Sequence, residues 1–153
     1  MAARGGTGSN NWLIAGGLLS AVAALLHIAI IFGGADWYRF FGAGEGMARA
    51  AERGSWRPAL LTGAIAAILF TWSAYAFSGA GLIRRLPLVR TALVLIAAIY
   101  LARALAPVAA LIVASRTIDP FMVWSSLIVL VYGVAYAAGT WTAWPSLRSG
   151  ARP

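Results

Sequence analysis

The sequence contains no cysteine and no lysine, a single histidine, and only four acidic residues among its 153 positions. Without cysteine the chain has no disulfide framework, no thiol nucleophile and no thiolate metal site. One histidine and four carboxylates also leave no readable metal-ligand cluster and no set of nucleophile, base and orienting group. We therefore expect neither a cofactor nor a metal, and an enzymatic activity is the less favoured interpretation.

Charged residues of every kind are scarce: they make up 10% of the chain, whereas hydrophobic residues make up 61%. A soluble domain carries about 25% charged residues, so the composition indicates a membrane protein. The net charge of +8 comes from twelve basic residues, all arginine, most of them in short segments between apolar runs. This pattern is typical of topology signals and lipid-phosphate contacts, so membrane lipid is the expected partner and nucleic acid is not. The arginine, alanine and glycine content favours a GC-rich genome and hence a bacterium.

Four apolar runs are each long enough to cross a hydrocarbon core of about 30 Å as a helix rising 1.5 Å per residue. They cover residues 12–34, 58–78, 91–114 and 121–143. The first run is too long for a signal peptide, although Ala-Val-Ala at 21–23 resembles a cleavage site. We predict an all-α protein with one transmembrane domain, 12–143, folded as a four-helix transmembrane bundle. Residues 1–11 are predicted to form a flexible tail and residues 144–153 a second tail.

An even number of spans places both termini on one side of the membrane. That side carries six arginines: Arg4, Arg84, Arg85, Arg90, Arg148 and Arg152. The other side carries five: Arg39, Arg49, Arg53, Arg57 and Arg116. The concentration of arginines in the short loop "RRLPLVR" (84–90) favours the first side as the cytoplasmic one. We therefore predict a multi-pass protein of the inner cell membrane with both termini in the cytoplasm.

The loop at 35–57 is the longest connection and is rich in aromatic residues of the types that settle at lipid headgroups. Glu45 and Arg49 stand four residues apart with the acid first, which is the favourable order on a helix. We predict a short interfacial helix at 45–53, across the mouth of the bundle. It either packs against headgroups or forms a lid over a cavity.

Arg103 is the most unusual residue, because it lies near the middle of the third run. Each end of that run is about 16–18 Å away, which is farther than an arginine side chain can reach. Exposing this group to lipid would cost at least about 2.5–3.5 kcal/mol, so we expect Arg103 to face the bundle interior. Tyr100 shares its helix face, and Pro107 removes the N–H that would bond to the carbonyl of Arg103. Arg103 is either half of a structural ion pair or a site for an anionic or polar ligand group.

His27 lies on a face of the first helix that also carries Gly16, Ser20 and Ala24, small residues that allow close helix packing. Because the first and third helices run in the same direction, His27 and Arg103 are expected at similar depths and able to line one cavity. Tyr132 sits in the middle of the fourth run, away from the usual interface positions. Two acids, Asp36 and Asp119, follow the first and third helices. They are candidate partners in the pocket, or else a helix cap and a turn residue.

Arg84, Arg85 and Arg90 follow the glycine-containing segment "SGAG" (78–81). This combination is a candidate contact for anionic lipid headgroups, although the arginines also serve as a plain topology signal.

Three classes of function stay open. The favoured one is the binding or transport of a small polar, anionic or lipid-like ligand in an interior pocket, or a role as a subunit of a membrane complex. The second is a small membrane-embedded enzyme acting on a lipid, with His27 or an acid as general base and Arg103 holding the anion. The third is a structural or assembly partner. Four helices are few for a lone transporter, so a homo-oligomer or a membrane-complex partner is expected.

Overall fold

The computed structural model describes residues 10–114 and 120–148, and the described residues form helices without any strand. The helices are α1 (Asn11–Phe40), α2 (Glu45–Glu52), α3 (Arg57–Gly79), α4 (Val89–Ala114) and α5 (Pro120–Arg148). All except α2 are long and apolar enough to cross a membrane. The prediction of an all-α, four-helix bundle with a short helix in its first loop is confirmed.

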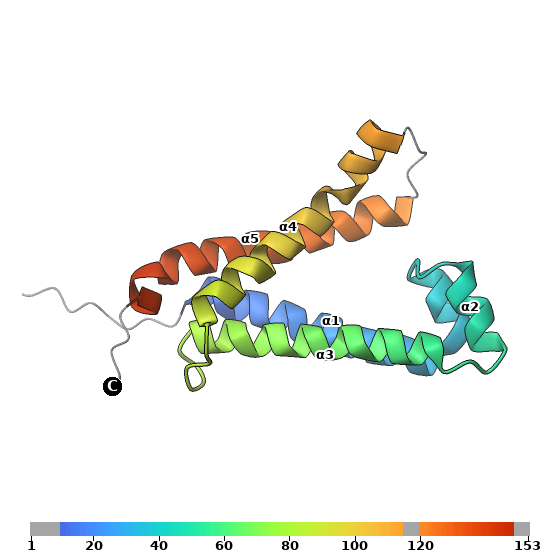
Figure 1. The fold of residues 1–153 in the computed structure, drawn as a ribbon, viewed down its shortest axis with the longest axis horizontal. Coiled ribbons are helices and arrows are strands. Elements are labelled where there is room, and N and C mark those ends of the chain that lie inside the picture. Colours follow the sequence, from blue (N-terminus) through green and yellow to red (C-terminus); the bar gives the residue numbers. More distant parts are fainter. Residues whose placement is uncertain (1–9, 115–119, 149–153) are drawn as a thin grey trace, which may run out of the picture.

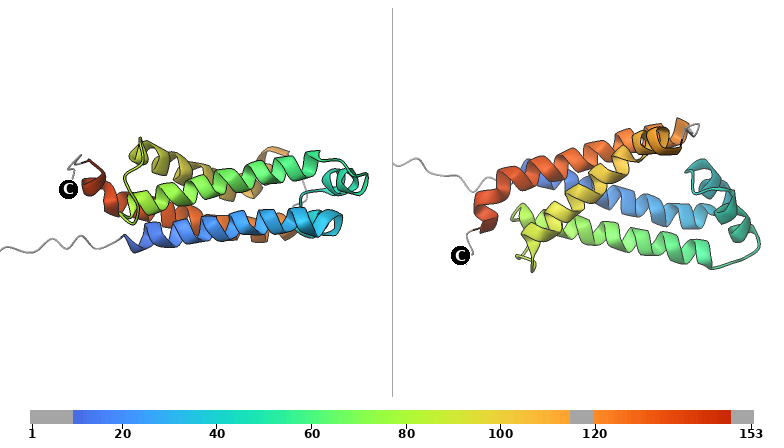
Figure 2. Two further views of the ribbon diagram at one scale, coloured as in Figure 1. Left: turned by 90° about the horizontal axis from the view of Figure 1, so that it is seen from below. Right: turned by 45° about the horizontal axis from the view of Figure 1, so that its top comes forward.

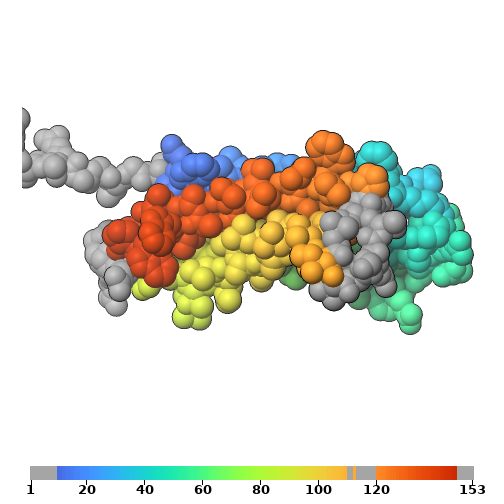
Figure 3. Space-filling view, turned by 90° about the horizontal axis from the view of Figure 1, so that it is seen from above, coloured from blue at the N-terminus to red at the C-terminus, as the bar shows by residue number. Residues whose placement is uncertain are grey.

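The long helices form two antiparallel pairs. Helix α1 packs mainly against α3, and α4 packs mainly against α5, while α1–α5 and α3–α4 contacts join the pairs. The start of α1 and the end of α5 lie at one end of the bundle, here called the termini end (Figure 1). From there the two pairs diverge toward the opposite end, which carries α2 (Figure 2). Seen from above, α4 and α5 run side by side and form one face of the molecule (Figure 3).

Small residues on α1 allow the close approach between the pairs. Gly16, Ser20 and Ala24 are all buried, as their four-residue spacing predicts. A Cβ atom added to Gly16 would lie 3.0 Å from the ring of Tyr136 on α5. The ring therefore packs directly on the α1 backbone, which requires glycine or a comparable gap at this position.

Asn10 links the beginning of α1 to the C-terminal part of α5 by hydrogen bonds. Its side-chain oxygen accepts a hydrogen bond from the backbone N–H of Leu13 at 3.2 Å and caps α1. Its amide nitrogen donates to the carbonyl of Gly139 at 2.7 Å and to the hydroxyl of Thr142 at 2.8 Å. The tail predicted at 1–11 thus joins the bundle at Asn10, and residues 1–9 lie outside the described part of the chain.

Helix α5 continues through Pro145 to Arg148, beyond the predicted limit at residue 143. Proline lacks the N–H of a regular helical turn, but other donors support this last turn. The hydroxyl of Ser146 donates to the carbonyl of Ala143 at 2.7 Å. Arg85 donates to the carbonyls of Ser146 and Leu147, which places a cation at the negative end of the helix dipole. The predicted tail at 144–153 is therefore helical in its first residues.

Gly34 ends the straight part of α1. Its φ of 67° and ψ of −150° break the helix, and glycine is the residue that adopts this conformation without strain. The break falls at the predicted end of the first span and redirects residues 35–40 toward α2. Ile30, Tyr38 and Ala48 form a small buried cluster that holds α2 against α1.

Arg39 joins α2 to α1 by electrostatic contacts. Its guanidinium bonds to Glu45 at 3.0 and 3.1 Å, to Glu52 at 2.7 Å and to Asp36 at 3.4 Å. Glu45 also accepts a bond from Arg49 at 3.0 Å, in the pairing expected from their spacing. The hydrogen bonds from Arg39 and then Arg49 lower the pKa of Glu45 from 4.5 to about 2.

This arrangement predicts an acid-labile attachment of α2. Because the pKa of Glu45 is lower in the folded protein, its contribution to stability is fully present above about pH 4.5 and disappears as the pH falls through about 2. An NMR titration of the Glu45 carboxyl carbon is expected to give a midpoint near 2 in the wild type and a clearly higher one in Arg39→Gln. A wild-type midpoint near 4.5 would show that the contact is absent in solution.

Candidate ligand cavity between the helix pairs

A cavity of about 620 Å³, here called the lateral cavity, lies between the two helix pairs. Its lining comes from α1, α3, α4 and α5, with Phe41 added from the turn after α1. Several lining residues are exposed on the outside of the bundle, among them Ile68, Ile99, Trp124 and Ile128. The cavity is therefore open toward the surface that faces lipid when the bundle spans a membrane.

The structure brings four of the predicted pocket residues together: His27, Tyr100, Arg103 and Tyr132 all line the lateral cavity. Asp36 does not belong to it, because it lies at the α2 end with a 93% exposed side chain and contacts Arg39. The break at Gly34 turns Asp36 away from the bundle interior. Asp119 lies outside the described residues.

Arg103 lines the lateral cavity, but it is exposed rather than enclosed in the bundle interior as expected, and hydroxyl groups hold it there. Its Nη1 donates to Ser126 Oγ at 2.9 Å, and its Nη2 donates to Ser125 Oγ at 3.3 Å. Both partners are neutral, and none of the described lining residues carries a carboxylate. A guanidinium has five N–H donors, so two serines leave donors available for a further acceptor. Within the described residues, Arg103 is thus a cation on the cavity wall without a counter-ion.

A chain of hydrogen bonds, in which each hydroxyl donates to the next group, connects Tyr100 and Trp72 of the cavity lining. Ser20 Oγ lies 2.9 Å from the hydroxyls of both Tyr100 and Tyr136, and the Tyr136 hydroxyl donates to the carbonyl of Trp72 at 3.0 Å. Because a carbonyl cannot donate, Tyr136 uses its only proton on Trp72 and accepts from Ser20. Ser20 in turn accepts from Tyr100. The chain joins α4, α1, α5 and α3 with every hydroxyl satisfied.

Ser20→Ala is expected to lower the free energy of unfolding by about 1–2 kcal/mol, because it interrupts this chain at its centre and leaves the buried Tyr100 hydroxyl without an acceptor. Thr71→Ala is the matched control, since among the described residues the Thr71 hydroxyl bonds to the carbonyl of Ala67 on its own helix and to no other helix. Thermal unfolding in mild detergent measures both variants. If the two variants unfolded at the same temperature, the proposed chain of hydrogen bonds through Ser20 would be refuted.

Aromatic rings complete the wall around Tyr100. Its ring centroid lies 4.9 Å from Trp72 and 5.5 Å from Tyr132, in edge-to-face contacts. At the α2 end the ring of Phe121 lies against Gly42, where an added Cβ would clash with it. Phe41 and Phe121 both line the cavity, whereas no described residue of α2 does. The turn before α2, rather than the helix itself, therefore borders the cavity.

His27 contacts its own helix rather than a neighbour. Its Nδ1 lies 2.7 Å from the carbonyl of Ala23, so Nδ1 carries a proton. In a neutral ring Nε2 is then a hydrogen-bond acceptor. Ligands that offer a hydroxyl or protonated acid group could use it from within the cavity. The described residues contain no cluster of three acidic or histidine side chains able to hold a metal ion.

The predicted headgroup arginines lie at the termini end. Arg85 and Arg90 line a second cavity, while Arg84 is exposed and its backbone carbonyl accepts a hydrogen bond from the Ser78 hydroxyl at 3.2 Å. Sequence reasoning missed Ser126 as a partner of Arg103 and Ser20 as the centre of the tyrosine chain. Adjacent serines in the apolar run of α5 were the available signal for the first. Nothing in the sequence indicated which helix would approach Ser20.

These features define the chain as a membrane protein built on four apolar helices with a polar-edged lateral cavity. Comparisons with protein-family models, curated proteins and solved structures find no match to this chain.

Proposed function

We propose that the protein binds an amphiphilic anion, a lipid-like molecule with an acidic group, in the lateral cavity. One observation carries the proposal: Arg103 lies on the wall of this cavity with two neutral serine hydroxyls as its partners among the described residues. An arginine in an apolar environment is costly unless an anion or water compensates its charge. An acidic ligand group beside Ser125 and Ser126 would provide that compensation and would accept charge-assisted hydrogen bonds.

The rest of the cavity favours an apolar body for the ligand. Most described lining residues are aliphatic or aromatic, and the exposed isoleucines at the rim border the lipid-facing surface. An amphiphile could enter sideways from the membrane, with its acidic group toward Arg103 and its apolar part against Trp72 and Tyr100. Pockets with mostly apolar walls and few polar groups are typical of small-molecule sites.

Native mass spectrometry of the full chain in mild detergent, titrated with oleate as the probe and oleyl alcohol as its neutral analogue, tests the proposal. We expect oleate to bind at least about tenfold more tightly than the alcohol, and Arg103→Gln to remove about that factor. Arg53→Gln is the control, because Arg53 is an exposed arginine outside the cavity lining. Equal affinity of both probes, or equal loss in both variants, would refute anion recognition by Arg103.

We also propose that the termini end faces the cytoplasm and that the membrane is the inner cell membrane. Arg84, Arg85 and Arg90 lie in or next to the short connection between α3 and α4, with no acid among the described residues there. Short loops rich in arginine are retained on the cytoplasmic side.

The absence of native cysteine allows a direct test of this orientation. Arg53→Cys at the α2 end and Leu82→Cys at the termini end each introduce one exposed thiol. A membrane-impermeant maleimide is expected to label Arg53→Cys in intact cells and Leu82→Cys only after permeabilisation. The reverse labelling pattern would show that the α2 end, and not the termini end, faces the cytoplasm.

A further inference from the structure

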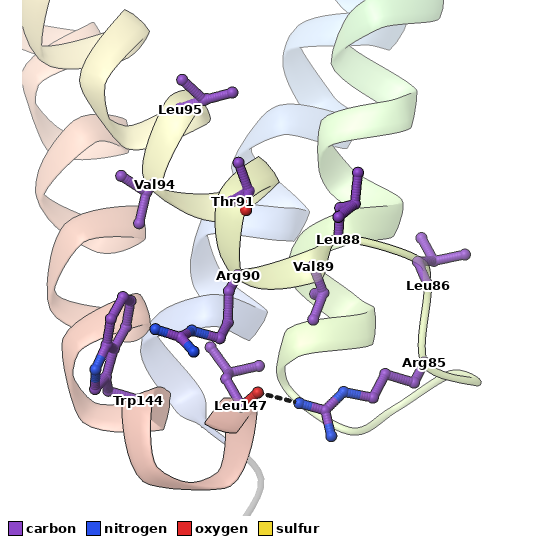
Figure 4. Close-up of a pocket in the computed structure, with 10 residues that line it drawn as sticks. All are labelled: Arg85, Leu86, Leu88, Val89, Arg90, Thr91, Val94, Leu95, Trp144 and Leu147. Atoms are coloured by element: carbon purple, nitrogen blue, oxygen red, sulfur yellow. Dashed lines mark hydrogen bonds between the residues drawn. The ribbon is translucent and has the colours of Figure 1, made fainter. Parts of the chain in front are cut away.

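A second hollow lies on the opposite half of the molecule, along α4 and α5. Near the termini end it is a cavity of about 620 Å³ whose lining includes Arg85, Arg90 and Trp144 (Figure 4). A neighbouring cavity of about 640 Å³ continues along the same two helices and shares Val94 and Trp144 with the first. Because they share these two lining residues the two cavities adjoin one another, and together they are here called the basal groove. It shares no lining residue with the lateral cavity.

Arg90 gives the groove its charge. Its guanidinium carbon lies 4.1 Å from the centroid of the Trp144 ring, a cation–π contact that orients the group without supplying an oxygen acceptor. Its Nε is buried and has no hydrogen-bond partner among the described residues. Arg85 reaches the last turn of α5 from the other side of Leu147 (Figure 4). The groove therefore begins at a fixed guanidinium whose charge has no carboxylate partner among the described residues.

The remainder of the groove is mostly apolar, with Thr91 and Thr140 as the threonines of its lining, and it has about the length of one lipid leaflet. Beyond Arg90 its lining includes Val94, Leu101 and Trp141, of which Val94 and Trp141 are exposed. Arg90 and Leu101 are eleven residues apart on one helix, which corresponds to about 16 Å along the axis. Half of a typical hydrocarbon core is about 15 Å thick. An acyl chain in this groove would thus extend from the headgroup level to the membrane centre.

We propose that the basal groove is a binding site for one anionic glycerophospholipid. Its phosphate accepts hydrogen bonds from Arg90, and one acyl chain lies between α4 and α5. Charge complementarity favours this occupant, because Arg85 and Arg90 line the groove and no acid lies among the described residues of this end. The long apolar part of the groove favours a lipid over a free phosphate, because only a lipid has an acyl chain to occupy it. The site is independent of the proposed function, since it uses different residues at the other end of α4.

Native mass spectrometry of the full chain, titrated with dioleoyl phosphatidylglycerol and separately with dioleoyl phosphatidylcholine, tests this site. We expect one phosphatidylglycerol to bind about tenfold more tightly than phosphatidylcholine, and Arg90→Gln to abolish that preference. Arg84→Gln is the matched control, because it removes the same charge from an exposed position outside the groove. If Arg90→Gln and Arg84→Gln lowered the preference for phosphatidylglycerol equally, the preference would come from the general surface charge, and the proposal would be overturned.

Ala98→Phe provides a second, charge-neutral variant, because Ala98 is an exposed lining residue and a phenyl ring there would fill the apolar part of the groove. It is expected to weaken phosphatidylglycerol binding while Arg90 is intact. Glycerol 1-phosphate should compete only weakly; competition at the lipid's own concentration would assign the site to a free phosphate instead and refute it. Arg103→Gln is expected to leave phosphatidylglycerol binding unchanged, which separates this site from the lateral cavity.

Discussion

Arg103→Met is expected to leave the melting temperature of the detergent-solubilised protein at or above that of the wild type. Methionine keeps much of the side-chain length and removes the charge. Breaking a buried ion pair costs about 3–5 kcal/mol, because it leaves the partner charge uncompensated. Here the partners are the hydroxyls of Ser125 and Ser126, and Ser125 already donates to the carbonyl of Met122. Neither serine is left as a stranded charge when the guanidinium is removed.

Circular dichroism during heating, on Arg103→Met beside the wild type, measures this directly. Ser126→Ala serves as the control for the loss of the hydrogen bond alone. A drop in stability of 3–5 kcal/mol in Arg103→Met would identify Arg103 as half of a structural ion pair, and the proposed ligand site would lose its main support. An unchanged melting temperature combined with lost oleate binding would assign the arginine to function, as expected where stability and activity conflict.

Gly139→Ala is expected to destabilise the bundle by about 1–3 kcal/mol, through overpacking where α1 meets α5. A Cβ atom at this position would lie 2.7 Å from Leu13 Cγ and 2.9 Å from the backbone nitrogen of Leu13. Leu13 is fully buried, and its backbone cannot move without the whole helix. The carbonyl of Gly139 also accepts the bond from Asn10, so separating the helices weakens the cap of α1 as well.

Gly46→Ala is the matched control for this substitution. Gly46 lies within α2 and has nothing within 4 Å of an added Cβ. Alanine in a helix is favoured over glycine by about 0.5–1 kcal/mol, so this variant should be as stable as the wild type or slightly more stable. Thermal unfolding under identical detergent conditions compares the two. If Gly139→Ala unfolds at the wild-type temperature, α1 and α5 are not in the close contact described here.

Much of the site was predictable because helical periodicity places residues on faces before any partner is known. Tyr100 and Arg103 share a face of α4, and His27 follows the small residues of α1, so a common cavity was a reasonable expectation. Asp36 was not predictable in the same way. It follows the first apolar run closely, but the backbone conformation of Gly34 decides where it points, and it lies at the surface beside Arg39.

The sequence by itself determined the class of the protein, its four apolar helices, the short helix of the first loop and the common end of both termini. These follow from hydropathy and from the 3.6-residue period, which are local properties of the chain. Only the tertiary structure decided that α1 pairs with α3 and α4 with α5, that the pairs diverge around the lateral cavity, and that Ser125 and Ser126 hold Arg103. The reason is physical: apolar helices are nearly equivalent in hydropathy, and the close approaches of Gly17 to α3 and of Gly133 to α4 select which neighbours fit.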